Sequence, residues 1–258
     1  LKVYAWFEFG FAAAYGTQGI HLLDGRPHWR ALDGEGQLAV KNGFAWMNAF
    51  HPEVQALLTD LILEVATRYE VDGIQGDDRL PALPSLAGYE PYTRALYQAE
   101  HDGAEPPSDY RDPEWVQWRA DRLSDYLHGL YDTLKAVRPD LIVSMAPSIY
   151  PWSKEEYLQD WPRWLAEGWV DEVCPQIYRY DIDRYIHELD KIVQAQVGPG
   201  LHHRLAPGIL LKVGDYYASQ GLLDSMIQAN RARGIEGEVF FFYEGIRRHE
   251  AYFREAYP

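Results

Sequence analysis

Two kinds of apolar pattern alternate along the chain. Short apolar runs, typical of buried strands, alternate with longer segments in which apolar residues recur at helical spacing. The short runs predict strands at residues 1–7, 71–75, 141–146, 170–178, 205–211 and 237–243. The longer segments predict helices at residues 51–70, 114–137, 154–167, 182–197, 220–233 and 245–258. Such an alternation predicts a parallel sheet whose strands are connected by crossover helices.

Six strand–helix units fit a (β/α)8 TIM-barrel type of fold from which two of the eight strands are missing. The composition does not change along the chain, so we expect one domain over residues 1–258. Because the sequence opens directly on a strand, we expect the barrel to be truncated at its N-terminus. An open six-stranded sheet of another topology is the alternative.

Two segments, residues 9–48 and 80–112, show little helical periodicity. Each follows a predicted strand and is rich in glycine, proline or aspartate and in aromatic residues. The run Asp-Gly-Glu-Gly at residues 33–36 predicts a hairpin turn in the first segment. Loops of this length inside a compact domain usually serve function.

Composition argues against several classes of protein. The net charge of −15 argues against nucleic-acid binding, which needs a basic surface, and against attraction to anionic membranes. No apolar run is long enough to span a bilayer. The single cysteine, Cys174, excludes an internal disulfide, and its apolar strand predicts a buried structural thiol. Composition gives no indication of the oligomeric state.

Aromatic residues are the one compositional excess, with 9 tryptophans and 19 tyrosines in 258 residues. Most of them are expected to pack in the core or on the surface. In an acidic cleft, however, their rings suit sugars, because the CH faces of a sugar stack on aromatic planes. The expected partner is therefore an oligosaccharide or polysaccharide.

Acidic residues, tyrosines and a glutamine follow the predicted strands. They include Glu8, Asp77, Asp78, Gln176, Tyr178, Tyr180, Tyr243 and Glu244. In a β/α barrel the C-terminal ends of all strands lie on one face, where active sites are built. Chemistry that needs two carboxylates around one bond is glycoside hydrolysis. The sequence therefore predicts a glycosidase-like site on this face.

The triplet Asp77-Asp78-Arg79 ends the second predicted strand. Adjacent aspartates repel when both are ionised, which raises the pKa of one of them and favours an acid role. Side chains alternate along a strand, so we expect only one aspartate to face the cleft. If Arg79 pairs with Asp78, that carboxylate stays charged. In the alternative interpretation the aspartates only cap a helix or pair with Arg79, while Glu8 and Glu244 form salt bridges or caps.

Histidines do not indicate a metal site. His202 and His203 precede a strand and thus lie at the end of the barrel opposite the catalytic face, where surface histidines are expected. His51 stands at the head of a predicted helix, which suits a capping role. We therefore expect no metal and no cofactor.

These motifs resemble those of the glycosyl-hydrolase-like family ten. The most specific is Val-Asp-Gly-Ile-Gln-Gly-Asp-Asp at residues 71–78, preceded by Asn-Ala-Phe-His-Pro-Glu-Val at residues 48–54. Residues 3–8, 175–178 and 240–244 fit in the same order. The resemblance implies a (β/α)8 barrel in proteins that are often secreted or envelope-attached. It also implies that residues 1–7 form the third barrel strand.

The same resemblance implies roles for individual residues. Asp77 and Asp78 match the catalytic acids, whereas Asn48, Gln176 and Tyr178 match cleft-lining positions. The sequence departs from the family pattern at Gly76, where a bulky aromatic residue is usual, and at Arg79, where tyrosine or histidine is usual.

We therefore interpret the chain as a retaining glycoside hydrolase acting on an envelope or extracellular glycan, for which a glycan that contains N-acetylhexosamine is one candidate. Asp78 is the first catalytic carboxylate and Asp77 its helper, with Glu244 as the preferred partner and Glu8 in reserve. The residues expected to position the sugar are Trp6, Asn48, Gln176, Tyr178, Tyr180, Tyr243 and Arg79. With an acetamido substrate, the aspartate pair could instead steer the substrate's own amide into attack.

Two other functions remain open at this point. A non-catalytic carbohydrate-binding barrel would use the same aromatic residues. A metal-dependent hydrolase would use Asp77, Asp78 and a histidine as ligands.

Overall fold

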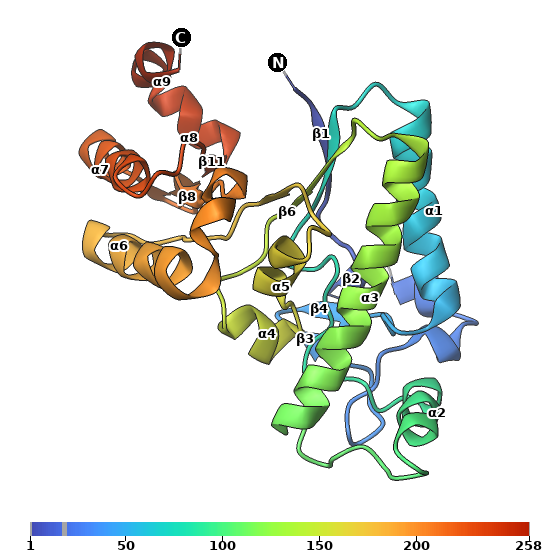
Figure 1. The fold of residues 1–258 in the computed structure, drawn as a ribbon. Helices are drawn as coiled ribbons and strands as arrows, with labels where there is room; N and C mark the ends of the chain where they lie inside the picture. Colours follow the sequence, from blue (N-terminus) through green and yellow to red (C-terminus); the bar gives the residue numbers. More distant parts are fainter. Residues whose placement is uncertain (1, 17–19, 258) are drawn as a thin grey trace.

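The computed structural model describes residues 2–16 and 20–257. Its centre consists of six parallel strands: β1 (Tyr4–Phe7), β5 (Gly73–Gly76), β6 (Ile142–Met145), β7 (Glu172–Val173), β8 (Gly208–Leu210) and β11 (Val239–Phe241). Strands β1, β5, β6 and β7 pair in that order, and β8 pairs with β11. Isolated parallel bridges from Val173 to Leu205 and from Gln176 to Gly208 connect the two groups. The order is that of a partial (β/α)8 barrel, with the strands surrounded by helices (Figure 1). Each strand overlaps a predicted run.

Long helices cover the outer side of the strands. They are α1 (Pro52–Arg68), α3 (Pro113–Val137), α6 (Ile182–Lys191) and α7 (Gln220–Arg231). Helix α1 buries Val54, Leu58, Ile62 and Ala66, which recur every fourth residue and form one stripe. Helix α1 packs against α3, and α6 packs against α7. The helical periodicity read from the sequence is thus confirmed for these four helices.

Two predicted helices are each divided in two. Residues 154–167 form α4 (Trp152–Tyr157) and α5 (Trp161–Ala166). The break follows Leu158, whose φ of 61° is left-handed, and Pro162 has no N–H with which to continue a helix. In place of the helix predicted at residues 245–258, the structure has α8 (Tyr243–Arg248) and α9 (Glu250–Ala256), and residue 258 lies outside the described residues. The prediction of single helices at these places was wrong.

Both long segments contain regular structure. In the first, β2 (Ala12–Tyr15), β4 (Phe44–Trp46) and β3 (Val40–Lys41) form an antiparallel sheet in the order β2–β4–β3. Its turn at residues 33–36 is closed by a bridge between Leu32 and Leu38, as predicted. The second contains α2 (Pro91–Glu100), which sequence reasoning missed. A short hairpin, β9 (Lys212–Val213) and β10 (Tyr216–Tyr217), follows β8 and was also missed.

The two long segments are joined to each other beyond the C-terminal ends of β1 and β5 (Figure 1). Asp33 and Ala87 form a bridge between them. The buried carboxylate of Glu90 accepts a hydrogen bond from the Leu32 N–H at 2.6 Å. Arg119 of α3 is fully buried and donates to three backbone carbonyls in residues 85–110. These contacts fix the wall around one end of the barrel.

Candidate active site

The end of β5 decides where the two aspartates point. The strand stops at Gly76, and the chain turns at once, with the Leu80 N–H donating to the Asp77 carbonyl at 3.1 Å. A Cβ on Gly76 would lie 2.5 Å from both the Leu80 carbonyl oxygen and Met145 Sδ, so the turn needs glycine there. Since strand alternation ends at Gly76, Asp77 and Asp78 both line the pocket described below. The expectation that only one would face the cleft was wrong.

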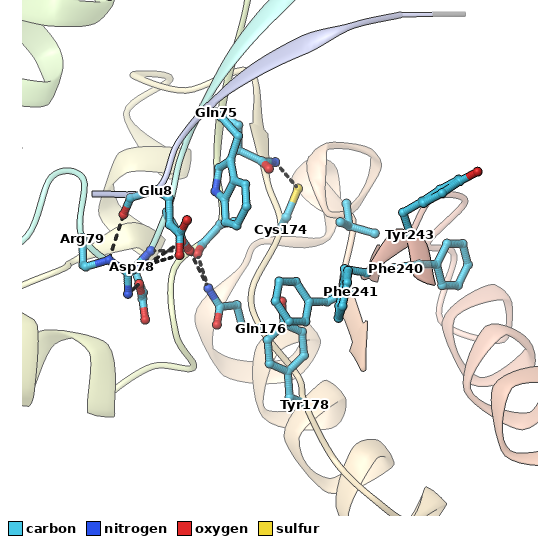
Figure 2. A pocket seen from close by; sticks show the side chains of 16 residues that line it. Glu8, Gln75, Asp78, Arg79, Cys174, Gln176, Tyr178, Phe240, Phe241 and Tyr243 are labelled. Atoms are coloured by element: carbon cyan, nitrogen blue, oxygen red, sulfur yellow. Dashed lines mark hydrogen bonds and ion pairs between the residues drawn. The ribbon is translucent and has the colours of Figure 1, made fainter. Parts of the chain in front are cut away.

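A pocket of about 380 Å³ lies at the C-terminal ends of the strands. Its lining residues are Trp6, Glu8, Gln75, Asp77, Asp78, Arg79, Ala146, Cys174, Gln176, Tyr178, Gly208, Val239, Phe240, Phe241, Phe242 and Tyr243. Glu8, Asp78 and Arg79 lie on one side, and Tyr178, Phe241 and Tyr243 lie on the other (Figure 2). This is the face at which β/α barrels build their active sites.

Arg79 contacts all three carboxylates of the pocket. Its Nη2 lies 3.2 Å from Asp77 Oδ2 and 3.3 Å from Glu8 Oε1. Its Nη1 lies 2.8 Å from Asp78 Oδ1. The guanidinium is held in place from behind by the Phe44 ring, 4.6 Å away, and by the Glu8 carbonyl, which accepts from Nε at 2.8 Å. The ion pair between Arg79 and Asp78 considered from the sequence is therefore present, and it belongs to a larger cluster.

Asp77 is the most buried of the three acids, with 8% of its side chain exposed. Its Oδ1 accepts hydrogen bonds from the Asp78 N–H at 2.7 Å and from Gln176 Nε2 at 2.9 Å. Burial, and next the charge of Asp78, raise the pKa of Asp77 to about 7, against the opposing effect of Arg79. Burial also raises the pKa of Asp78, which Arg79 counteracts. The pair therefore retains a proton at a pH where isolated aspartates have lost theirs.

The floor of the pocket is polar. Gln75 of β5 donates to Ser144 Oγ at 3.0 Å, and Gln176 donates to the Ala146 carbonyl as well as to Asp77. Cys174 is buried, as predicted, and burial raises the pKa of its thiol well above the usual value. Sequence reasoning missed Gln75 as a lining residue. The available signal was a polar side chain within an otherwise apolar strand.

The opposite side of the pocket is aromatic. The rings of Tyr178 and Phe241 stack with centroids 5.4 Å apart. Burial, and next the charge of Asp77, raise the pKa of Tyr178, so its hydroxyl stays protonated. Tyr243 on this side is 71% exposed, and Trp6 of β1, the strand that leads to Glu8, is 50% exposed. Both offer faces on which a sugar ring can stack. Sequence reasoning missed the contribution of the run from 240 to 242, although three consecutive phenylalanines at the end of a predicted strand were a visible signal.

Three of the predicted site residues lie outside the lining of this pocket. Asn48 is fully buried, where its Oδ1 accepts from the Phe50 N–H and its Nδ2 donates to Thr93. Glu244 is directed to Lys212, at 3.0 Å, and to the hydroxyl of Tyr217, at 3.2 Å. Tyr180 is 57% exposed and packs edge-on against Tyr216. Each of these three side chains instead contacts neighbouring residues outside the pocket.

The histidines have the places that the sequence predicted. His51 is the N-cap of α1, and its Nδ1 accepts from the Glu53 N–H at 3.3 Å. His202 and His203 lie in a 3-10 turn (Pro199–Arg204) that precedes β8. Across residues 2–16 and 20–257, no group of three or more His, Cys, Asp or Glu side chains is placed to hold a metal ion. Nor does any helix in those ranges have the length and apolarity required to cross a membrane.

Several solved structures with a similar fold are glycosidases by their descriptions. The glycoside hydrolase domain of PgaB (BpsB) from Bordetella bronchiseptica superposes with a TM-score of 0.73 and 18% identity, over 96% of this chain and 72% of that chain. A β-galactosidase from Marinomonas ef1 gives 0.62 and 14%, over 93% and 44% of the two chains. Alpha-L-fucosidase isoenzyme 2 from Paenibacillus thiaminolyticus gives 0.58 and 17%, over 95% and 34%. The fold is therefore the barrel type of glycoside hydrolases.

A family model classifies the chain more specifically than the fold does. A family model described as Glycosyl hydrolase-like 10 matches residues 1–200, and the chain belongs to this family. Glycosyl hydrolase DigH from Escherichia coli (strain K12) is 25% identical over 155 residues. That match covers 51% of this chain and 33% of DigH, so it spans about a third of that relative.

Proposed function

We propose that this protein is a retaining glycoside hydrolase whose reacting carboxylates are Asp78 and Glu8. The observation that carries the proposal is a pocket with clustered acids on one side and stacked aromatic rings on the other. Such a pocket can hold a sugar ring on its apolar face and present carboxylates to its glycosidic bond. Membership of the family and the glycosidase fold support the same reaction class.

Both proposed reacting carboxylates bind one guanidinium, which supports the retaining mechanism over the inverting one. Arg79 Nη2 lies 3.3 Å from Glu8 Oε1, and Nη1 of the same group lies 2.8 Å from Asp78 Oδ1. Retaining enzymes place their carboxyl groups about 5–5.5 Å apart, whereas inverting enzymes need about 6.5–9.5 Å to admit a water molecule. The shared guanidinium therefore holds the acids close together.

The two aspartates differ in exposure, and their proposed roles follow from this difference. The side chain of Asp78 is 28% exposed and can meet the glycosidic oxygen, whereas that of Asp77 is 8% exposed. The aspartate pair retains one proton, and Asp78, as the more exposed partner, delivers it to the leaving oxygen while Glu8 attacks the anomeric carbon to form a glycosyl-enzyme. Water then releases the sugar while Asp78 takes up its proton. Asp77 acts as a positioning residue, because it binds the Asp78 N–H and is itself held by Gln176.

The remaining lining residues hold the sugar. Trp6, Tyr178 and Tyr243 provide ring faces, and Arg79 keeps the acids in place. For a substrate with an acetamido group, the aspartate pair can instead orient the amide oxygen for attack on the anomeric carbon, with Asp78 still donating the proton. The resemblance to the family favours an envelope or extracellular glycan as the substrate.

A non-catalytic glycan-binding barrel is the second candidate function. It is favoured by one observation, that Arg79 already engages Glu8, Asp77 and Asp78. Under this proposal the acids and Arg79 form a fixed structural cluster, and only the aromatic side of the pocket engages the glycan.

The test is reducing-end release from a panel of N-acetylhexosamine-containing and neutral glycans. Asp78→Asn is expected to lower kcat at least about 100-fold, the usual contribution of general acid–base catalysis. Glu8→Gln removes the nucleophile and is expected to prevent formation of the glycosyl-enzyme. Glu64→Gln, an exposed carboxylate on α1, is the matched control and should retain wild-type turnover. Turnover that is unchanged in Asp78→Asn would refute the assignment. Glycan binding without turnover, unaltered in an Asp77→Asn, Asp78→Asn double variant, would favour the binding barrel.

A further inference from the structure

A second group of aromatic residues lies next to the pocket without belonging to it. Phe9 follows Glu8, Tyr15 ends β2, and Phe44 begins β4. The Phe44 ring contacts Phe9 at a centroid distance of 5.6 Å and Tyr15 at 4.9 Å. We call these three residues the hairpin platform.

The hairpin platform is exposed and yet held in place. Tyr15 and Phe9 are 61% and 45% exposed. The Tyr15 ring rests on Gly43, where a Cβ would lie 2.8 Å from the ring. Gly43 has a φ of +80°, a conformation that favours glycine, so bare backbone supports the ring from below. A ring fixed in this way loses little conformational entropy when a ligand stacks on it.

Arg79 connects the hairpin platform to the pocket. Its guanidinium lies 4.6 Å from the Phe44 ring on one side and contacts the three acids on the other. The platform therefore begins where the charged side of the pocket ends. Tyr243 extends the aromatic surface on the opposite side of the pocket (Figure 2).

The size of the pocket requires a longer glycan to continue outside it. A volume of about 380 Å³ is at the small end of ligand sites and accommodates only a short piece of a glycan. A protein partner is a poorer match for the platform, because stable protein interfaces bury roughly 800 Å² on each side, far more than three rings provide. Aromatic faces in line with a sugar pocket suit further sugars of the same chain.

We propose that Phe9, Tyr15 and Phe44 form a distal subsite that binds sugars of the same glycan beyond those held in the pocket. The inference rests on the proposed function for the location of the pocket, but it concerns binding rather than bond cleavage. It implies that affinity rises with chain length, and that the increase depends on the hairpin platform.

The test measures affinity by calorimetry for β-linked N-acetylglucosamine oligomers and for cello-oligomers, each with two and with six sugars. All measurements use the Asp78→Asn background, so that no probe is consumed. Tyr15→Ala is expected to weaken binding of the best six-sugar probe roughly threefold to tenfold and to leave the two-sugar probe unchanged. Tyr15→Phe keeps the ring and should restore affinity. Tyr69→Ala removes an equally exposed tyrosine at the end of α1 and serves as the control.

Two results would overturn the inference. One is a six-sugar affinity no higher than the two-sugar affinity for every probe, including no binding at all. The other is an equal loss for both lengths in Tyr15→Ala. Failure of the proposed function looks different, since it would leave the length-dependent binding intact while the wild-type protein released no reducing ends. If the wild-type protein released reducing ends but its affinity did not depend on glycan length, the hydrolase proposal would be supported and the distal subsite refuted.

Discussion

Replacing Asp77 by asparagine should change how the stability of the protein depends on pH. The pKa of Asp77 is raised from 3.8 to about 7 in the folded protein, so the native state binds a proton more tightly than the unfolded chain does. Stability from this group is fully present below the unfolded pKa and is lost as pH rises through the folded pKa. The wild-type free energy of unfolding should therefore fall between about pH 4 and pH 7 on account of Asp77.

The magnitude follows from the same two values. The difference between 3.8 and about 7, at about 1.4 kcal/mol per pKa unit, corresponds to roughly 4 kcal/mol. Little of this is lost to solvent screening, because the side chain is only 8% exposed. Asparagine has the same shape and can still accept at Oδ1 from the Asp78 N–H and Gln176, but it does not titrate. Asp77→Asn should therefore lack the decrease between pH 4 and pH 7.

The assay is urea unfolding followed by tryptophan fluorescence at pH 4.5, 6, 7.5 and 8.5, for the wild type and Asp77→Asn. The quantity of interest is the difference in unfolding free energy between the two proteins at each pH, because titrating groups that do not interact with Asp77 cancel in it. In the control Asp102→Asn, asparagine replaces an exposed aspartate, and the unfolding free energy should depend on pH as it does in the wild type. If the difference between wild type and Asp77→Asn stayed constant over this range, the argument from burial would be refuted.

Two further substitutions test other parts of the structure. Arg119→Met leaves three backbone carbonyls of the 80–112 segment without this donor, two of them buried and one partly buried. A loss of about 3 kcal/mol in unfolding free energy and faster proteolytic cleavage of that segment are expected. Unchanged cleavage would contradict this. Glu244→Gln should lower kcat/KM less than Glu8→Gln does, because Glu244 contacts Lys212 outside the pocket whereas Glu8 lines the pocket. The reverse order would indicate that Glu244, and not Glu8, is the catalytic partner of Asp78.

Local sequence patterns determined most of the framework. Apolar runs and helical spacing depend only on neighbouring residues, and they located all six parallel strands and the four long helices. The capping role of His51 and the burial of Cys174 followed from their local context in the same way. Local rules that were overlooked account for some errors, because Pro162 signalled the break before α5 and Pro91 signalled the start of α2.

The barrel topology allowed part of the candidate site to be anticipated. C-terminal strand ends converge on one face, so Glu8, Asp77 and Tyr178 could be expected together although up to 170 residues separate them, and the structure does bring them to one pocket. Convergence on a face does not specify side-chain partners, however. The partners of Asn48 and Glu244 are set by helix and hairpin packing that no local pattern records.

The arrangement of charge was decided by tertiary structure alone. The sequence placed Arg79 beside Asp78, but only the fold brings Glu8 from β1 within 3.3 Å of the same guanidinium and sets the Phe44 ring behind it. The turn after Gly76 directs both aspartates into the pocket, and the burial that raises the pKa of Asp77 comes from distant segments packed around it. Sequence determines which groups are available to react. Distance, exposure and solvent exclusion determine what those groups can do, and these quantities arise only when the chain is packed.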